Sequence, residues 1–351
     1  MKTIQGPAIF LAQYMGEKPP FDDIVKAAEW AAGLGYEAIQ VPTWETRGFD
    51  LAQAAESQSY CDDFRARLEA VGSQPCELST HLQGQLVAVH PAYDAMFDGF
   101  APESVRGNPK ARQAWAVEQV KQSIRASSKL GLRATVTFPG ALAWPYFYPW
   151  PQRPAGLVEE AFAELARRWK PILDLAAEEG IDVCYEVHPG EDLHDGATWE
   201  RFLAEVDGHE RANILFDPSH FVLQGMDEVA FLHNYHERIK MFHVKDAELR
   251  ADGRTGVYGG YLPWAERAGR FRTPGHGDCD WGEIFTALCR YDFEGWAVVE
   301  WEDPYQDSGQ GAEQAADFVR EQILKAAESS FDDFAASGVD QELNRRVLGL
   351  D

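Results

Sequence analysis

Short apolar runs alternate with amphipathic stretches along the whole chain. Runs typical of buried strands occur at 9–14, 36–42, 76–82, 133–140, 182–187, 213–218, 239–246 and 296–301. Between them, apolar residues recur at helical spacing over 21–35, 57–71, 109–130, 159–180, 197–206, 227–237, 281–291 and 312–328. Strand and helix patterns that alternate in this way predict a parallel sheet covered by helices.

The number of strand–helix units favours one closed barrel. About eight units fit a (β/α)₈ TIM barrel, and no glycine-rich dinucleotide motif follows the first strand to favour a doubly wound sheet. We therefore predict one catalytic domain over 1–328, with long insertions at about 83–108 and 247–280. We expect the remaining residues, 329–351, to form a C-terminal extension packed on or beside the barrel.

Charge and cysteine content narrow the class of protein. The chain of 351 residues carries 57 acidic and 32 basic side chains, a net charge of −25, which disfavours binding to nucleic acid or to anionic membranes. No stretch is long and apolar enough for a membrane span, and the first residues do not resemble a signal peptide. Five scattered cysteines predict free thiols, which are typical of a reducing cytoplasm.

Four late strands end in side chains that commonly bind metals. Glu186, Asp217, His243 and Glu300 each stand at the carboxyl end of a predicted strand, where barrel enzymes place their active sites. Three clustered carboxylates repel one another unless a cation neutralises them. We therefore predict a divalent metal site. Its oxygen-rich ligand set suits Mn²⁺ first, with Mg²⁺ or Co²⁺ as alternatives.

Further polar residues stand beside these predicted ligands. Residues two apart point to the same side of a strand, so His188, Lys245 and Glu302 should face the same barrel mouth. We expect His188 to take part in acid–base chemistry and Lys245 to stabilise an oxyanion. His81 ends the third predicted strand, and substrate contact and a buried structural role are equally open for it.

Five motifs carry a family resemblance. The chain reads EVHPGE at 186–191, FDPSH at 216–220, FHVKD at 242–246, PGxGxxDW at 274–281 and VVEW at 298–301. In this it resembles the xylose-isomerase-like TIM-barrel superfamily of sugar phosphate isomerases and epimerases, ketose 3-epimerases and inosose dehydratases. The resemblance implies metal ligation by the four residues named above. It also implies proton transfer by Glu186 and Glu300, and substrate contact by His220.

The long insertions resemble one branch of that superfamily. Segments 236–248 and 253–272 are similar to those of 3-keto-glycoside lyases and of the larger subunit of C-glycoside deglycosidases. Proton abstraction next to a sugar carbonyl leads through one enediolate to an epimer, an isomer or an eliminated product. A metal-dependent sugar isomerase or epimerase is thus our first interpretation, and a lyase or hydratase on 3-keto-glycosides is the alternative.

Alternatives are open for two predicted substrate-binding residues in the loops, and for the partners of the protein. Arg272 either binds an anionic substrate group or pairs with the acidic surface. Trp144 either stacks on a sugar or aglycone or packs its own loop. An apurinic-site endonuclease is disfavoured by the acidic charge, and a non-catalytic binding module by the complete ligand set. Fold analogy favours a homo-oligomer, and a second, smaller subunit is left open.

Overall fold

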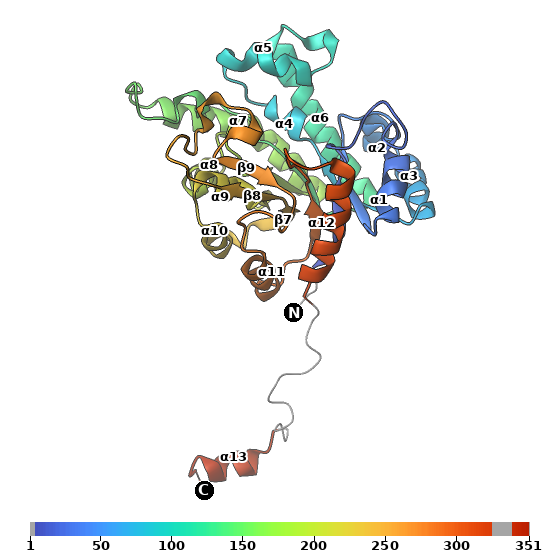
Figure 1. Ribbon diagram of the computed structural model, residues 1–351, viewed down its shortest axis with the longest axis vertical. Coiled ribbons are helices and arrows are strands. Elements are labelled where there is room, and N and C mark those ends of the chain that lie inside the picture. The colour runs from blue at the N-terminus through green and yellow to red at the C-terminus, as the bar shows by residue number, and fades with distance from the viewer. Residues whose placement is uncertain (1–3, 325–338, 351) are drawn as a thin grey trace.

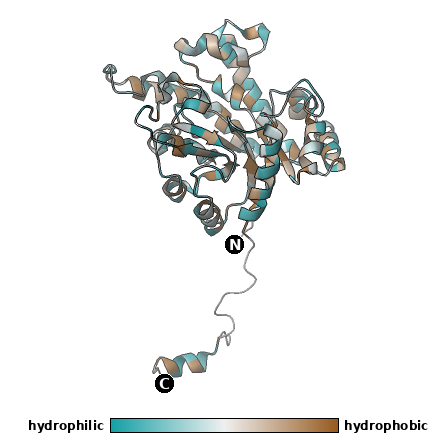
Figure 2. Cartoon of the chain, viewed as in Figure 1, coloured by the Kyte–Doolittle hydropathy of each residue, from teal (hydrophilic) through white to brown (hydrophobic). Residues whose placement is uncertain are grey.

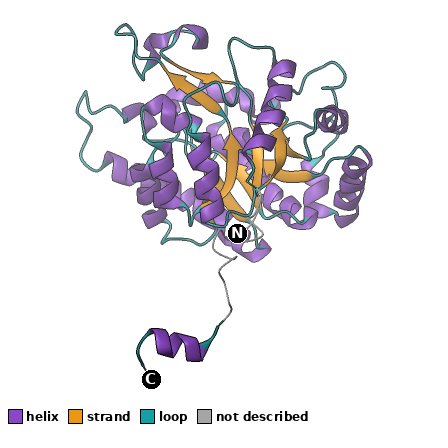
Figure 3. Cartoon of the chain, turned by 60° about the horizontal axis from the view of Figure 1, so that its bottom comes forward, coloured by secondary structure: helices purple, strands orange, loops and turns teal. Residues whose placement is uncertain are grey.

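The computed structural model describes residues 4–324 and 339–350 (Figure 1). Eight strands of this part of the chain close into a parallel barrel in the spatial order β1-β10-β7-β6-β5-β4-β3-β2, which confirms the predicted TIM barrel. Figure 3 shows these strands at the centre with helices around them. The strands are β1 (Gln5–Phe10), β2 (Ala38–Pro42), β3 (Pro75–Ser79), β4 (Ala134–Thr137), β5 (Asp182–Glu186), β6 (Ala212–Phe216), β7 (Ile239–Val244) and β10 (Trp296–Val299).

Amphipathic helices cover the outside of the barrel. Their apolar faces pack on the strands, and Figure 2 shows hydrophilic and hydrophobic residues alternating along them. Asn108 caps the long helix α6 at one end, and Gly131 ends it with a φ of 71°. The helices are α1 (Ile24–Gly33), α2 (Leu51–Glu56), α3 (Gln58–Ala70), α6 (Pro109–Leu130), α7 (Leu157–Glu179), α8 (Gly196–Glu205), α9 (Ser219–Gln224), α10 (Glu228–Tyr235), α11 (Trp281–Arg290) and α12 (Ser308–Gln322).

An apolar layer inside the barrel determines what faces its mouth. Cys184, Leu215 and Met241 are buried together in the interior, and Val298 belongs to a neighbouring interior cluster. Side chains alternate along a strand, so the residue two positions further on points to the same side, one layer nearer the carboxyl ends. Those next residues are the four predicted metal ligands.

Several predicted element boundaries were wrong. The third strand ends at Ser79 rather than near residue 82, and His81 begins a helix. The first strand begins at Gln5 and ends at Phe10, and residues 12–14 form a turn in which Tyr14 and Met15 donate backbone hydrogen bonds to Leu11. Pro7 is the reason why the start of this strand was not predicted, because proline is rare inside strands. Proline has no N–H to donate, and the pairing between β1 and β10 is irregular at this position. The last barrel helix begins at Ser308, because Asp307 caps it, and the predicted residues 325–328 lie outside the described part.

The insertions have structure of their own. The first holds the short helices α4 (His81–Gln85) and α5 (Asp94–Phe97) with several helical turns, and the second holds the antiparallel hairpin β8 (Asp246–Leu249) and β9 (Gly269–Arg272). In the C-terminal extension, helix α13 (Gln341–Val347) has no buried residue, and 329–338 lie outside the described part. Its packing on the barrel stays a prediction. None of the described helices has the length and apolar character to cross a membrane.

Candidate metal centre

Four buried side chains meet at the carboxyl ends of neighbouring strands. Glu186 ends β5, Asp217 follows β6, His243 lies near the end of β7 and Glu300 follows β10. One ligand atom from each lies within 4.8 Å of the others. This is the arrangement predicted from the strand ends, and it follows from the parallel register of β5, β6, β7 and β10.

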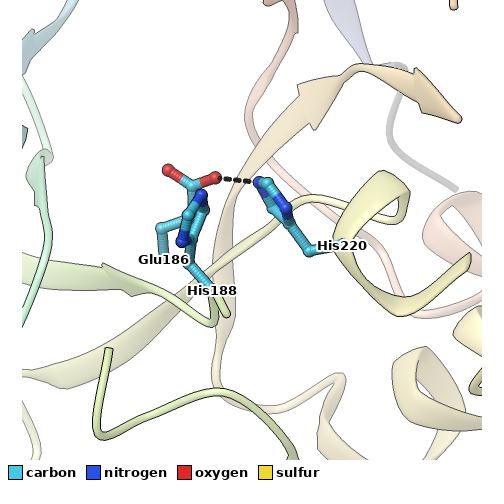
Figure 4. Close-up of side chains that lie close together, drawn as sticks. All are labelled: Glu186, His188 and His220. Atoms are coloured by element: carbon cyan, nitrogen blue, oxygen red, sulfur yellow. Dashed lines mark hydrogen bonds and ion pairs between the residues drawn. The ribbon is translucent and has the colours of Figure 1, made fainter. Parts of the chain in front are cut away.

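Glu186 is held by histidines on both of its carboxylate oxygens. His220 Nε2 lies 2.9 Å from Oε1 and His81 Nε2 lies 2.9 Å from Oε2. In Figure 4, Glu186 and His188 leave the strand end on the same side and the His220 ring faces the carboxylate. His81 is the first residue of α4 rather than a strand residue, and Ser79 Oγ contacts its Nδ1 at 2.6 Å.

Glu300 follows β10, which β7 and β6 separate from β5, and it has partners of its own. Its Oε2 is 2.9 Å from His243 Nδ1 and 3.4 Å from Lys245 Nζ, and Gln13 Nε2 donates to its Oε1 at 2.8 Å. Lys245 also pairs with Glu302 at 3.0 Å. Lys245 therefore contacts the cluster directly through Glu300, and Glu302 contacts Lys245.

Asp217 provides the clearest sign that a cation fits here. Its Oδ1 accepts hydrogen bonds from the backbone N and Oγ of Ser219, at 2.9 and 2.7 Å. Its Oδ2 is buried and accepts no hydrogen bond from a described donor; the nearest cationic group is His220 Nε2, at 3.3 Å. A buried carboxylate oxygen without a hydrogen bond is costly. A divalent ion among three carboxylates and one imidazole would satisfy it.

Protonated side chains balance the carboxylates when no ion is bound. Burial opposes ionisation of Glu300, yet the charges of Lys245 and His243 lower its pKa to about 2. Burial likewise opposes the charging of His243 and His220, but the neighbouring carboxylates raise the pKa of each to about 9. Burial opposes ionisation of Glu186, yet the hydrogen bond to His220 and the neighbouring charges of His81 and His220 hold its pKa well below the usual value.

His188 behaves differently from the other two histidines at the cluster. Burial and the nearby charge of His220 lower its pKa to about 3, so its imidazole is neutral at physiological pH. Its Nδ1 is buried and makes no hydrogen bond to a described residue. Its ring centroid lies 4.1 Å from that of His220. A neutral ring with a free nitrogen beside the cluster is suited to accept a hydrogen bond from a substrate hydroxyl, while a pKa of about 3 makes it a weak base, so its predicted part in acid–base chemistry stays a prediction.

Two predicted substrate contacts lie in the loops around the mouth. Trp144 is half-buried and stacks on Phe147 with ring centroids 4.6 Å apart. Arg272 lies in the hairpin, where it pairs with Glu248 at 3.0 Å and with Asp303 at 3.3 Å. Its charge is thus already balanced by the acidic groups of the fold, and a direct substrate contact by Arg272 stays a prediction.

Several polar residues of the site were missed. Gln13 lies in the turn after β1, just past an apolar run, and reaches Glu300. Beneath the cluster, Gln40 Nε2 donates to Glu77 at 2.6 Å and lies 2.9 Å from His243 Nε2. The sequence offered one signal for Gln40 and Glu77, since each is a polar residue inside an otherwise apolar strand. An amide offers both a donor and an acceptor, so Gln40 can support either tautomer of His243.

Comparisons with known proteins show what this chain is similar to. A family model described as xylose isomerase-like TIM barrel matches residues 28–322. Inosose dehydratase of Geobacillus thermodenitrificans is 33% identical over 132 residues, which cover 37% of this chain and 44% of that protein. The chain spans about half the length of the curated relatives it matches.

Solved structures extend the comparison to the whole fold. The 3-keto-D-glucoside 4-epimerase from E. coli aligns with a TM-score of 0.60 at 14% identity, covering 92% of this chain and 100% of that one. The zinc-bound IOLI protein aligns with a TM-score of 0.58 at 16% identity, covering 91% and 98%. At these identities the likeness shows the fold. With a family model that spans most of its barrel, this chain belongs to the xylose isomerase-like TIM barrel family.

Proposed function

We propose that the protein is a divalent-metal-dependent enzyme that removes a proton next to the carbonyl group of a sugar. The observation that carries this proposal is the buried four-ligand cluster with cationic Lys245 beside it. A bound metal would polarise the carbonyl oxygen of the substrate. The family and the named relatives, which are sugar epimerases and inosose dehydratases, support the same class of chemistry.

Side chains of this protein can carry out the proton transfer and can stabilise the negative charge that develops. Glu186 and Glu300 reach the cluster from β5 and β10, which β6 and β7 separate. One of them can take the proton from carbon and the other can return it to the far face. Lys245 is fully protonated, because Glu300 and Glu302 outweigh its burial and raise its pKa well above the usual range. Its ammonium group can stabilise the oxygen that becomes negative in the enediolate. Neutral His188 can accept a hydrogen bond from a sugar hydroxyl and so orient the sugar.

The same proton abstraction allows a second outcome. If a leaving group stands on the next carbon, its departure with the bonding electrons gives elimination instead of an epimer or isomer. Sequence similarity to inosose dehydratases favours this alternative, a lyase or hydratase acting on 3-keto-glycosides. The cluster itself serves both reactions. We also propose that the metal is Mn²⁺ and that the protein is located in the cytoplasm. We further propose a homo-oligomer, with or without a smaller second subunit.

Proton NMR in D₂O tests the proposal directly. Protein loaded with Mn²⁺, then freed of excess ion, is offered ketohexoses and a 3-keto-glucoside, with a chelator-treated control. Deuterium entering a ketohexose with a new epimer or isomer supports the first interpretation. Release of the aglycone, or an unsaturated keto-sugar, supports the alternative. If no exchange at any carbon next to a carbonyl depends on metal, the proposed function is wrong.

A further inference from the structure

A line of buried polar side chains crosses the barrel interior beneath the metal centre. Gln40 of β2 and Glu77 of β3 stand opposite each other in the register of these strands, and both are 0% exposed. Gln40 Nε2 donates to Glu77 Oε2 at 2.6 Å. The same amide meets the buried ring of His243, on β7, which β1 and β10 separate from β2. The line therefore joins a carboxylate on one wall of the barrel to a predicted metal ligand on another.

Glu77 is a costly residue at this position. Elsewhere in the interior, the layer beneath the cluster is made of Cys184, Leu215 and Met241, so the packing of the barrel does not require a carboxylate. Burial raises the pKa of Glu77 to about 7, and its Oε1 is buried without a hydrogen bond from a described donor. A buried carboxylate that is only partly hydrogen-bonded lowers stability. The cost points to a role at the metal centre rather than in the fold.

Glu77 determines how the amide of Gln40 is turned. An ionised carboxylate only accepts hydrogen bonds, so it takes an N–H of Gln40 and leaves the amide oxygen available to His243. Gln40 Oε1 lies 3.3 Å from His243 Nε2. The charges of Glu77 and His243 attract each other, which lowers the pKa of Glu77 against the effect of burial. The same attraction favours a proton on Nε2, the nitrogen of His243 that faces this amide.

The position of that proton decides whether His243 can be a ligand. Its other nitrogen, Nδ1, faces the cluster and lies 2.9 Å from Glu300 Oε2. A neutral imidazole carries one proton, so Nδ1 is free for a metal only when Nε2 keeps the proton. Gln40 Nε2 is also within reach of His243 Nε2, at 2.9 Å. If the amide donated to Nε2, the proton would move to Nδ1 and block metal binding.

We propose that Glu77 is a positioning residue of the metal centre, which acts through Gln40 to keep the proton of His243 on Nε2 and the lone pair of Nδ1 toward the metal. The inference rests on the proposed function for the presence of a metal alone, and needs neither the substrate nor the reaction. Phe10 supports the arrangement, because its ring stacks on that of His243 with centroids 5.9 Å apart and planes inclined by 27°.

Co²⁺ binding at pH 8 tests the inference without a substrate. At this pH Glu77, with a pKa of about 7, is ionised. Calorimetry on chelator-treated, desalted protein measures the affinity for Co²⁺. Proton NMR of the Co²⁺ protein shows the remaining ring N–H of a bound histidine as a strongly shifted signal that is lost in D₂O. We expect Glu77→Gln to weaken Co²⁺ binding about tenfold, to shift this signal and to speed its exchange with solvent.

Exchanging the two side chains separates a role at His243 from a role in packing. In the double variant Gln40→Glu with Glu77→Gln, the carboxylate faces His243 Nε2 directly and the amide lies behind it. The interior keeps one carboxylate and one amide. We expect the affinity for Co²⁺ to return to within about threefold of the wild type. If Glu77→Gln does not fold, the double variant compared with the wild type carries the test.

Glu228→Gln is the matched control, because it makes the same chemical change at a buried carboxylate away from the cluster. Glu228 lies on the outer helix α10 and accepts the backbone N–H of Asp280 at 3.0 Å. This variant should keep both the Co²⁺ affinity and the shifted N–H signal of the wild type. Circular dichroism and the melting temperature verify that each variant folds.

Three results would overturn the inference. They are wild-type affinity with an unchanged N–H signal in Glu77→Gln, a double variant that binds Co²⁺ no more tightly than Glu77→Gln or, if that variant does not fold, much more weakly than the wild type, and an equal loss in the Glu228 control. A wild-type protein that binds no Co²⁺ would overturn the proposed function as well. Because no sugar is present, the expected Co²⁺ results without any metal-dependent exchange in D₂O would overturn the proposed function alone.

Discussion

Replacing Glu300 by glutamine tests how the cluster is held together. Glu300 is 7% exposed, and its cationic neighbours lower its pKa from 4.5 to about 2. A carboxylate with a lowered pKa stabilises the fold above its unfolded pKa, and this stabilisation is lost as the pH falls toward 2. A drop of this size corresponds to about 3 kcal/mol at pH 7. Glu300→Gln keeps the shape of the side chain and removes the charge.

Urea unfolding of chelator-treated protein at pH 7 measures the effect. We expect Glu300→Gln to lower the free energy of unfolding by about 3 kcal/mol, because Lys245 and His243 lose their buried counter-charge. Glu302→Gln is the matched control. Its side chain is 38% exposed, so its pair with Lys245 should contribute less than about 1 kcal/mol.

Metal binding to the same variants gives a second measurement. Glu300→Gln should bind Mn²⁺ at least about 100-fold more weakly, and Glu302→Gln about as well as the wild type. If Glu300→Gln lies within about 1 kcal/mol of the wild type and also keeps its metal, Glu300 is neither a ligand nor a counter-charge, and the assignment of the cluster is wrong.

Three further outcomes follow from the charges and contacts of the site. His243 must lose a proton to bind a metal through Nδ1, and its pKa is about 9, so Mn²⁺ binding at pH 7.5 should release about one proton. Calorimetry in two buffers of different ionisation enthalpy measures this, and a binding heat independent of buffer would contradict it. His220 and His243 have raised pKa values, so their contribution to the stability of the metal-free protein should be complete at pH 6.5 and should be lost as the pH rises through 9. A melting temperature that stays constant from pH 6.5 to 9.5 would refute this. Asp192→Ala should free three backbone N–H groups and make residues 141–150 susceptible to limited proteolysis, with Asp195→Ala as the control.

The four cluster ligands could be predicted because they depend on a simple repeat. Parallel strands end at one edge of a barrel, and alternation along each strand carries Glu186, Asp217, His243 and Glu300 to the same side. Neither step requires knowledge of distant contacts. The same reasoning places His188 and Lys245 beside them. The barrel itself was predictable for a similar reason, since eight strand–helix periods determine its architecture.

Other parts of the site depend on pairings that no local pattern contains. Gln13 touches Glu300 across 287 residues of sequence, and the wrong boundary of the first strand placed Gln13 inside that strand. Arg272 is neutralised by Glu248 across the hairpin and by Asp303 after β10, neither of which periodicity connects to it. The cavity lined by Trp144, Phe147, Tyr258 and Trp264 lies between two loops more than a hundred residues apart.

The closure of the barrel has a consequence for how the chain folds. Strand β1 pairs with β10, so Gln5 lies opposite Trp296, and this pairing closes the barrel. Strand β10 also pairs with β7, so Glu300 reaches the cluster only when the last strand has been added to the other three. An ion that binds only the closed barrel stabilises the whole domain rather than one end of it. A nascent chain that stops before residue 296 has three of the four ligands and lacks β10, the strand that closes the barrel.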